Sequence, residues 1–240
     1  PRSQLSSSSA ASDVYKRQIE IGSAVTTDLM GETQLISPPV QEHLTTQVVI
    51  VGSGAAGMRT ALDLADAGVP TLLVTRGELT DSATDWAQGG LAAVWRADDS
   101  VDLHVADTLT AGAGLCDEQA VRTLVTRAPG ALRRLMADGA SFDTDDAGDI
   151  DLHLEGGHHA RRILHAGGDQ SGHEVEVTLA RRAGALDVCD HARLIDICTD
   201  CRGATCGVLV ARGGTTVEIS CDHVVLATGC LLYTSPSPRD

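Results

Sequence analysis

The sequence predicts an α/β fold, with a parallel sheet and a β-rich insertion, on three observations. An apolar run from Val48 to Val51 leads directly into a glycine-rich turn, and a segment with helical spacing follows it. Further helical segments alternate with short apolar runs, which is the pattern of a parallel sheet with crossover helices. Four strand-like runs lie close together between residues 186 and 220, and they predict the insertion.

The periodicity of apolar residues places the individual elements. Asp117 is a suitable N-cap, and Pro129 predicts a kink or a break in the helical region around it. The polar segment 143–172 has no period and is long for a passive loop. In chain order, we expect a strand over 47–51, a helix over 55–67, a strand over 71–75, helical segments between 101 and 137, a helix over 172–185, strands over 186–190, 193–198, 206–211 and 216–220, and a last, buried strand over 223–227.

The two ends of the chain differ from the rest. Residues 1–18 and 231–240 have no apolar periodicity and resemble translated cloning-vector sequence, and Cys230 is grouped with the second of them. Residues 19–46 are polar and irregular. We therefore expect a leader with an artefactual N-terminus over 1–46, one nucleotide-binding domain over 47–229 and an artefactual tail over 230–240, with the natural protein continuing beyond Gly229.

Composition narrows the class of protein. The chain has 240 residues, of which 42% are hydrophobic, and its net charge is -15. This charge argues against a nucleic-acid or anionic-membrane surface, and no apolar run approaches the ~18 residues of a membrane span. The seven cysteines predict reduced thiols in a cytoplasmic protein. Cys198 and Cys201 lack a second pair or histidines in register, so we expect a β-hairpin there and no metal site.

The glycine turn "GSGAAG" over Gly52–Gly57 stands in the strand–turn–helix context of a dinucleotide site. Gly52 allows the tight turn, Gly54 lets a pyrophosphate approach the backbone, and Gly57 lets the helix pack on the strand. The second strand is followed by Arg76 rather than by the acidic residue that an NAD site prefers. Arg76 suits the 2′-phosphate of NADP or the adenosine and pyrophosphate of FAD, and the turn alone leaves both open.

Four motifs together carry a resemblance. They are "VVIVGSGAAG" (48–57), "ATDWAQGGLAAV" (83–94), "LEGGHHARRILHAGGDQSGHEV" (154–175) and "VVLATG" (224–229). In this order they closely resemble the L-aspartate oxidases, within the flavoprotein family that also holds the succinate dehydrogenase and fumarate reductase flavin subunits. The resemblance implies a Rossmann-like FAD-binding domain that lacks the family's capping domain. The FAD contacts that it implies are Gly52, Ser53, Gly54, Ala55, Ala56, Gly57, Arg76, Ala83, Thr84, Asp85, Trp86, Ala87, Gln88, Gly89, Gly90, Ala192, Arg193, Thr228 and Gly229.

The resemblance also implies residue roles. Ala83 stands where succinate-oxidising members carry a flavin-linked histidine, so the FAD is expected to be non-covalent. Glu155 is the expected catalytic residue and would hold the α-ammonium of aspartate, because a carboxylate attracts an ammonium and repels a dicarboxylate. The alternative for Glu155 is a solvated loop acid. His158, Arg161 and Arg162 either support the residues that contact the ligand, position the flavin, or are solvated, and His159 and His165 stay unassigned.

The function implied is oxidation of L-aspartate to iminosuccinate by hydride transfer to FAD, with oxygen or fumarate as acceptor. The product would serve quinolinate and NAD biosynthesis, and quinolinate synthase is an expected partner. The family's substrate-binding His and Arg residues lie further along the chain, so this chain alone is expected to be inactive. Two alternatives remain: a succinate dehydrogenase or fumarate reductase-type flavin subunit, and a non-catalytic NADP-binding Rossmann domain.

Overall fold

The computed structural model describes residues 39–229, and the expectations for residues 1–38 and 230–240 lie outside them. A parallel sheet forms the centre of the fold, with strand order β11-β2-β3-β7. The strands are β2 (Val48–Val51), β3 (Thr71–Val74), β7 (Asp187–Cys189) and β11 (His223–Leu226). The predicted α/β fold with a parallel sheet is therefore confirmed.

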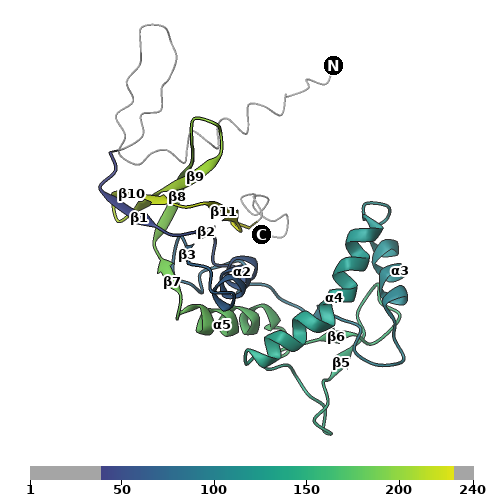
Figure 1. Ribbon diagram of the computed structural model, residues 1–240. Coiled ribbons are helices and arrows are strands. Elements are labelled where there is room, and N and C mark those ends of the chain that lie inside the picture. Colours follow the sequence, from purple (N-terminus) through teal and green to yellow (C-terminus); the bar gives the residue numbers. More distant parts are fainter. Residues whose placement is uncertain (1–38, 230–240) are drawn as a thin grey trace, which may run out of the picture.

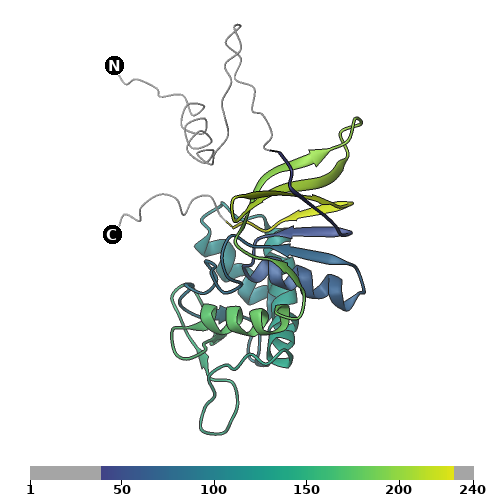
Figure 2. The ribbon, with the colours of Figure 1, turned by 90° about the vertical axis from the view of Figure 1, so that its left-hand side faces the viewer.

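Strand β2 is buried on both faces because its alternate side chains enter two different cores. Val48 and Ile50 pack with helices α2 (Ala55–Asp66) and α5 (Ser171–Ala183). Val49 and Val51 pack against a second sheet on the other side. Figures 1 and 2 show this order of layers, with strands β8 to β10 on one side of the parallel sheet and α2 and α5 on the other.

The second sheet contains three of the four runs that predicted the β-rich insertion. The expectation for the first run, 186–190, is wrong, because it forms β7 and pairs in parallel with β3. The order of the second sheet is β1-β10-β9-β8, antiparallel except for the parallel pair of β1 and β10. Its strands are β8 (Ala192–Thr199), β9 (Thr205–Arg212), β10 (Thr215–Ser220) and β1 (Glu42–Thr45). Cys198 and Cys201 lie at the β8–β9 hairpin, which is expected there from the sequence.

Two further expectations about the strands are wrong. Residues 42–45 are not irregular, since they form β1 and pair with β10. Their side chains are mostly exposed, so backbone pairing rather than apolar burial holds this strand. The last strand, β11, is not buried: it is an edge strand of the parallel sheet within residues 39–229, and Leu226 is 57% exposed.

A second lobe contains helices α3 (Val101–Ala111) and α4 (Glu118–Ala137) and a small antiparallel sheet of β4 (Leu91–Ala92), β5 (Leu152–His153) and β6 (Ile163–Leu164). Asp117 is the N-cap of α4, as predicted, and its carboxylate accepts from the Ala120 N–H at 2.7 Å. Pro129 does not break α4, which continues through it. No helix among residues 39–229 has the length and apolar character of a membrane span.

A buried ion cluster anchors this lobe. Arg162, which follows the "LEGGHH" segment, has no exposed side-chain surface. Its guanidinium binds both carboxylate oxygens of Asp99, at 2.7 and 2.8 Å, and Asp107 on α3 at 2.8 Å. Burial opposes ionisation of Asp107, but hydrogen bonds from His159 and Arg162 lower its pKa to about 2. Arg162 is thus paired within the protein, and of the alternatives given for it the solvated position is wrong.

We predict that Arg162→Met destabilises the fold by about 3–5 kcal/mol, because it leaves two carboxylates buried without their cation. The matched control is Arg122→Met, which removes an arginine whose pair with Asp102 is open to solvent and should leave stability nearly unchanged. Urea unfolding of both variants measures the difference. Equal, small effects would show that the buried cluster does not support the fold.

Candidate cofactor-binding site

The predicted cofactor residues gather at one edge of the parallel sheet. Because β2, β3, β7 and β11 are parallel, their carboxyl ends share this edge, which is where nucleotides bind to such sheets. The glycine turn follows β2, Arg76 follows β3, Ala192 and Arg193 follow β7, and Thr228 and Gly229 follow β11. The Ala192 N–H donates to the Thr75 carbonyl at 2.9 Å, which joins the ends of β7 and β3.

Two glycines of the turn are required by the protein's own packing. Gly52 has φ +112°, and a Cβ there would lie 2.3 Å from the Ala227 carbonyl oxygen. A Cβ on Gly57 would lie 1.8 Å from the Gly52 carbonyl oxygen. Any side chain at Gly57 would therefore push the start of α2 away from the end of β2, as the sequence motif predicts.

Gly54 differs from these two because the polypeptide does not exclude a side chain there. A Cβ would meet only the Thr84 and Ser82 hydroxyl oxygens, at 3.4 and 3.9 Å. Gly54 is also the N-cap of α2, beside the first-turn N–H groups of Ala56 and Gly57, which have no acceptor within residues 39–229. Open space, free N–H groups and the positive end of the helix dipole fit a pyrophosphate.

Ser53 lies in the turn with its side chain directed into the protein. It is 4% exposed, and its hydroxyl lies 2.8 Å from the Thr75 hydroxyl at the end of β3. This contact ties the turn to the neighbouring strand and leaves the backbone of Ser53, rather than its hydroxyl, to face a ligand. Sequence reasoning missed Thr75, because a threonine at a strand end carries no motif of its own.

The loop from Ser82 to Gly90 is fixed across the start of α2. The Ala55 N–H donates to the Thr84 hydroxyl at 3.0 Å. The other fixing contacts come from the second half of the chain: His173 with Asp85 at 2.7 Å, the Gly172 N–H with the Ala87 carbonyl at 3.1 Å, and the Gly89 N–H with Asp169 at 2.7 Å. The loop is thus held at both the glycine turn and α5.

The two glycines of this loop have structural reasons that the sequence did not indicate. Gly89 has φ +83°, which favours glycine. A Cβ on Gly90 would lie 2.2 Å from the Ile163 side chain and 2.8 Å from the Leu164 carbonyl, so Gly90 lets the loop pack on β6. The exposed residues of the loop are Ala83, Trp86, Ala87 and Gln88.

Glu155 reaches this loop through His165. The Glu155 carboxylate is half exposed and lies 2.8 Å from Nε2 of His165. Nδ1 of the same ring lies 2.8 Å from the Gly168 carbonyl, and its Cε1 lies 3.0 Å from the position of a Gly90 Cβ. His165, unassigned from the sequence, is therefore the link between Glu155 and the "AQGG" segment.

The remaining polar residues of the "LEGGHHARR" segment hold the segment itself. His159 contacts Asp107 through both its backbone N–H and its ring. Nδ1 of His158 lies 3.4 Å from the Arg162 guanidinium, and Arg161 donates to the Leu152 carbonyl at 3.4 Å. These contacts fix the loop that carries Glu155, and they hold the completely buried Arg162 side chain against Asp99 and Asp107.

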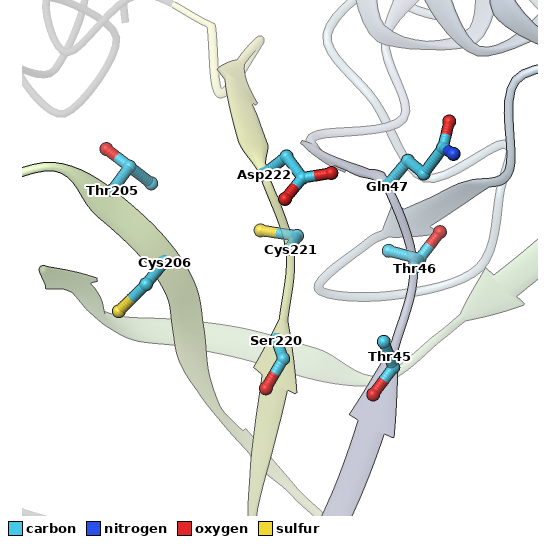
Figure 3. Close-up of a pocket in the computed structure, with 8 residues that line it drawn as sticks. All are labelled: Thr45, Thr46, Gln47, Thr205, Cys206, Ser220, Cys221 and Asp222. Carbon is cyan, nitrogen blue, oxygen red and sulfur yellow. The ribbon is translucent and has the colours of Figure 1, made fainter. Parts of the chain in front are cut away.

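A shallow depression of about 360 Å³ lies at the opposite edge of the sheets (Figure 3). It is lined by Thr45, Thr46, Gln47, Thr205, Cys206, Ser220, Cys221 and Asp222. Gln47 and Asp222 directly precede β2 and β11, so this depression borders the amino ends of the parallel strands. It is separate from the glycine turn.

Comparison with known proteins shows the family to which the chain belongs. The family model of the FAD binding domain matches residues 47–231. L-aspartate oxidase of Streptomyces coelicolor is 48% identical over 203 residues, which cover 82% of this chain and 35% of that protein. L-aspartate oxidase of Mesorhizobium japonicum is 41% identical over 191 residues, 78% of this chain and 37% of that protein. The chain thus spans about a third of the length of these relatives.

Solved structures show the same architecture. Quinol fumarate reductase of E. coli matches with a TM-score of 0.73 and 28% identity, over 79% of this chain and 33% of that chain. A flavocytochrome c3 fumarate reductase matches with a TM-score of 0.68 and 27% identity, over 78% and 34%. The family match overturns the alternative of an NADP-binding domain. The glycine turn and the free N–H groups at the start of α2 lie at the carboxyl edge of the sheet. By the match to the family model, the chain belongs to the FAD binding domain family, whose cofactor is FAD.

Proposed function

We propose that this chain is the FAD-binding part of an L-aspartate oxidase, which oxidises L-aspartate to iminosuccinate with oxygen or fumarate as acceptor. Its similarity to L-aspartate oxidases from two bacteria supports the proposal. The structural observation that supports it most is the position of Glu155. Its half-exposed carboxylate contacts His165, and His165 lies beside Gly90 in the Ser82–Gly90 loop, called the flavin loop below. A carboxylate there attracts the ammonium group of an amino acid.

The proposed FAD site follows the edge of the parallel sheet. Its pyrophosphate lies at Gly54 and the free N–H groups of α2, and its adenosine lies towards Arg76, Ala192 and Arg193. The Ser82–Gly90 loop borders the isoalloxazine, and Thr228 and Gly229 close the site beside Gly52. Ala83 cannot form a covalent flavin link, so the cofactor is non-covalent. Residues 47–229 form the FAD-binding domain.

The protein residues divide the remaining tasks between them. When bound, FAD supplies the two-electron acceptor for the hydride that leaves the aspartate Cα. Glu155 pairs with the substrate ammonium and so favours an amino acid over a plain dicarboxylate. His165 positions Glu155, because its second nitrogen is fixed by the Gly168 carbonyl. The buried Arg162 cluster keeps the intervening loop in place.

The cellular setting is part of the same proposal. The net charge of -15 supports a protein that binds small molecules rather than nucleic acid. We place the enzyme in the cytoplasm, in quinolinate and NAD biosynthesis, with quinolinate synthase as a partner that consumes iminosuccinate. The second candidate is a fumarate reductase-type flavin subunit, favoured by the structural matches and opposed by Ala83.

Gly54→Val should abolish FAD binding while the protein still folds. The valine side chain occupies the space proposed for the pyrophosphate, whereas the protein itself presents only two hydroxyl oxygens there. Flavin content after purification and the thermal unfolding midpoint of the flavin-free protein measure the two effects. A folded Gly54→Val protein with full flavin content would show that the pyrophosphate lies elsewhere.

Glu155→Gln in the full-length protein should reduce the stabilisation of the transition state for aspartate oxidation by ~1.5–3 kcal/mol, which is the range for a hydrogen bond to a charged group. This corresponds to roughly tenfold or more in kcat/KM. Fumarate reduction should fall much less, because fumarate has no ammonium group. Steady-state kinetics of both reactions provide the measurement.

The matched control for Glu155→Gln is Asp151→Asn. Asp151 is also a half-exposed carboxylate paired with a histidine, His153, at 3.1 Å, but it is not assigned to the substrate. Both reactions should be unchanged in Asp151→Asn. Equal losses with aspartate and fumarate in Glu155→Gln would mean that Glu155 does not bind the amino group.

A further inference from the structure

Helix α5 carries a carboxyl group that is buried without a partner. Glu176 has no exposed surface, and neither of its carboxyl oxygens has a hydrogen-bond partner within residues 39–229. A buried carboxyl group without a partner is costly, and nothing in the packing of α5 on α2 requires one. Core packing therefore does not account for the carboxyl group of Glu176, and a functional role has to be considered.

The groups beside Glu176 belong to the flavin loop. The hydroxyls of Ser82 and Thr84 are near its carboxyl group, although they do not reach hydrogen-bond geometry. Each hydroxyl oxygen already accepts a backbone N–H, from Thr84 to Ser82 and from Ala55 to Thr84, both at 3.0 Å. Their O–H protons stay available for an acceptor, and an ionised Glu176 would provide one.

The charged groups around Glu176 are few. Asp85, on the flavin loop, is the charged group that acts on it, and Asp85 pairs with His173, one turn earlier on α5. From α2, the buried residues that share a core with α5 are apolar, namely Met58, Ala61 and Leu62, and a charged contact between the two helices, Asp66 with Arg182, lies further along α5. Burial is the largest cause that raises the pKa of Glu176 to about 7; the Ser82 and Thr84 hydroxyls oppose this shift, and the negative charge of Asp85 contributes to it. Both protonation states are therefore accessible near neutral pH.

The Thr84 hydroxyl also borders the proposed pyrophosphate space, since it lies 3.4 Å from the position of a Gly54 Cβ. It can donate its one proton to Glu176 or to a phosphate, but not to both. A bound pyrophosphate adds negative charge close to Glu176, which favours the protonated carboxyl group. The loss of the Thr84 hydrogen bond and the negative charge of the pyrophosphate both favour protonation of Glu176 when FAD is bound.

We propose that Glu176 links FAD binding to proton uptake: the carboxyl group takes a proton from solvent when FAD binds, and the hydroxyls of Ser82 and Thr84 turn from Glu176 to the pyrophosphate. The proposal rests on the FAD site described above. The protonated form binds FAD better. FAD affinity is therefore highest below the pKa of Glu176 in the free protein and falls as the pH rises through it.

The test is a fluorescence titration of FAD into flavin-free protein at pH 6, 7 and 8.5. The dissociation constant should rise about fivefold or more between pH 6 and 8.5, at the lower end of the range for coupled sites. Calorimetry near pH 7 in two buffers of different ionisation enthalpy should show uptake of a fraction of a proton per FAD. This second measurement needs no variant.

Glu176→Gln keeps the shape of the protonated side chain, so it should bind FAD as tightly as the unchanged protein does at pH 6 and lose the pH dependence. The control is Glu174→Gln on the same helix, because the glutamine oxygen can still accept the Ser141 N–H. This variant should retain the pH dependence of FAD binding. A pH dependence that survives in Glu176→Gln would assign the proton to another group, such as His173, and overturn the proposal. Flat binding in the unchanged protein would overturn it as well, whereas no FAD binding at any pH would also reject the FAD site.

Discussion

The contact between Gly57 and the Gly52 carbonyl is the constraint on which the site depends. Because Gly57 has no side chain, the first turn of α2 lies directly against the end of β2. The free N–H groups of Ala56 and Gly57 are thereby placed at the carboxyl edge of the sheet, where the ends of all four parallel strands meet. This geometry supports the proposed phosphate site without any charged side chain.

A second close approach positions the Ser82–Gly90 loop, which is proposed to border the flavin, over that edge. A Cβ on Gly172, at the start of α5, would lie 2.2 Å from the Thr84 carbonyl and 2.4 Å from the Ala87 carbonyl. The loop is thus held between the N-terminal ends of α2 and α5, and its far end packs on β6 through Gly90. Glu155 and His165 lie next to β5 and β6, the small sheet on which Gly90 packs. The fixed loop therefore connects the proposed substrate-binding residue Glu155 with the proposed FAD site.

Local patterns in the sequence predict much of the fold. The apolar run before Gly52 predicts β2, and Asp117 predicts the start of α4, because both signals arise within a few residues. Strand β1 has no such signal, since backbone pairing with β10 forms it and its side chains are exposed. The position of β11 at the sheet edge depends on strand order, which the composition of a four-residue strand does not contain.

The site shows the same division. The glycine turn and the flavin loop are recognisable as motifs in the sequence. The hydrogen bond from the Ala55 N–H to the Thr84 hydroxyl brings the two motifs together, as a shared cofactor site requires. The roles of Arg162 and Glu176 depend on partners far away in the chain: Asp99 and Asp107 for the first, and the Ser82–Asp85 segment for the second. A single arginine or glutamate in a polar segment gives no sign that it is completely buried.

The most direct test of the site is amide hydrogen exchange of the protein with and without FAD, measured by mass spectrometry. The account predicts that FAD slows exchange in two segments, residues 52–58 and 82–90, and leaves the depression around Gln47 and Asp222 unchanged. Protection confined to residues 45–47 and 205–222, with the glycine turn unaffected, would contradict it and place the cofactor at the opposite edge of the sheet.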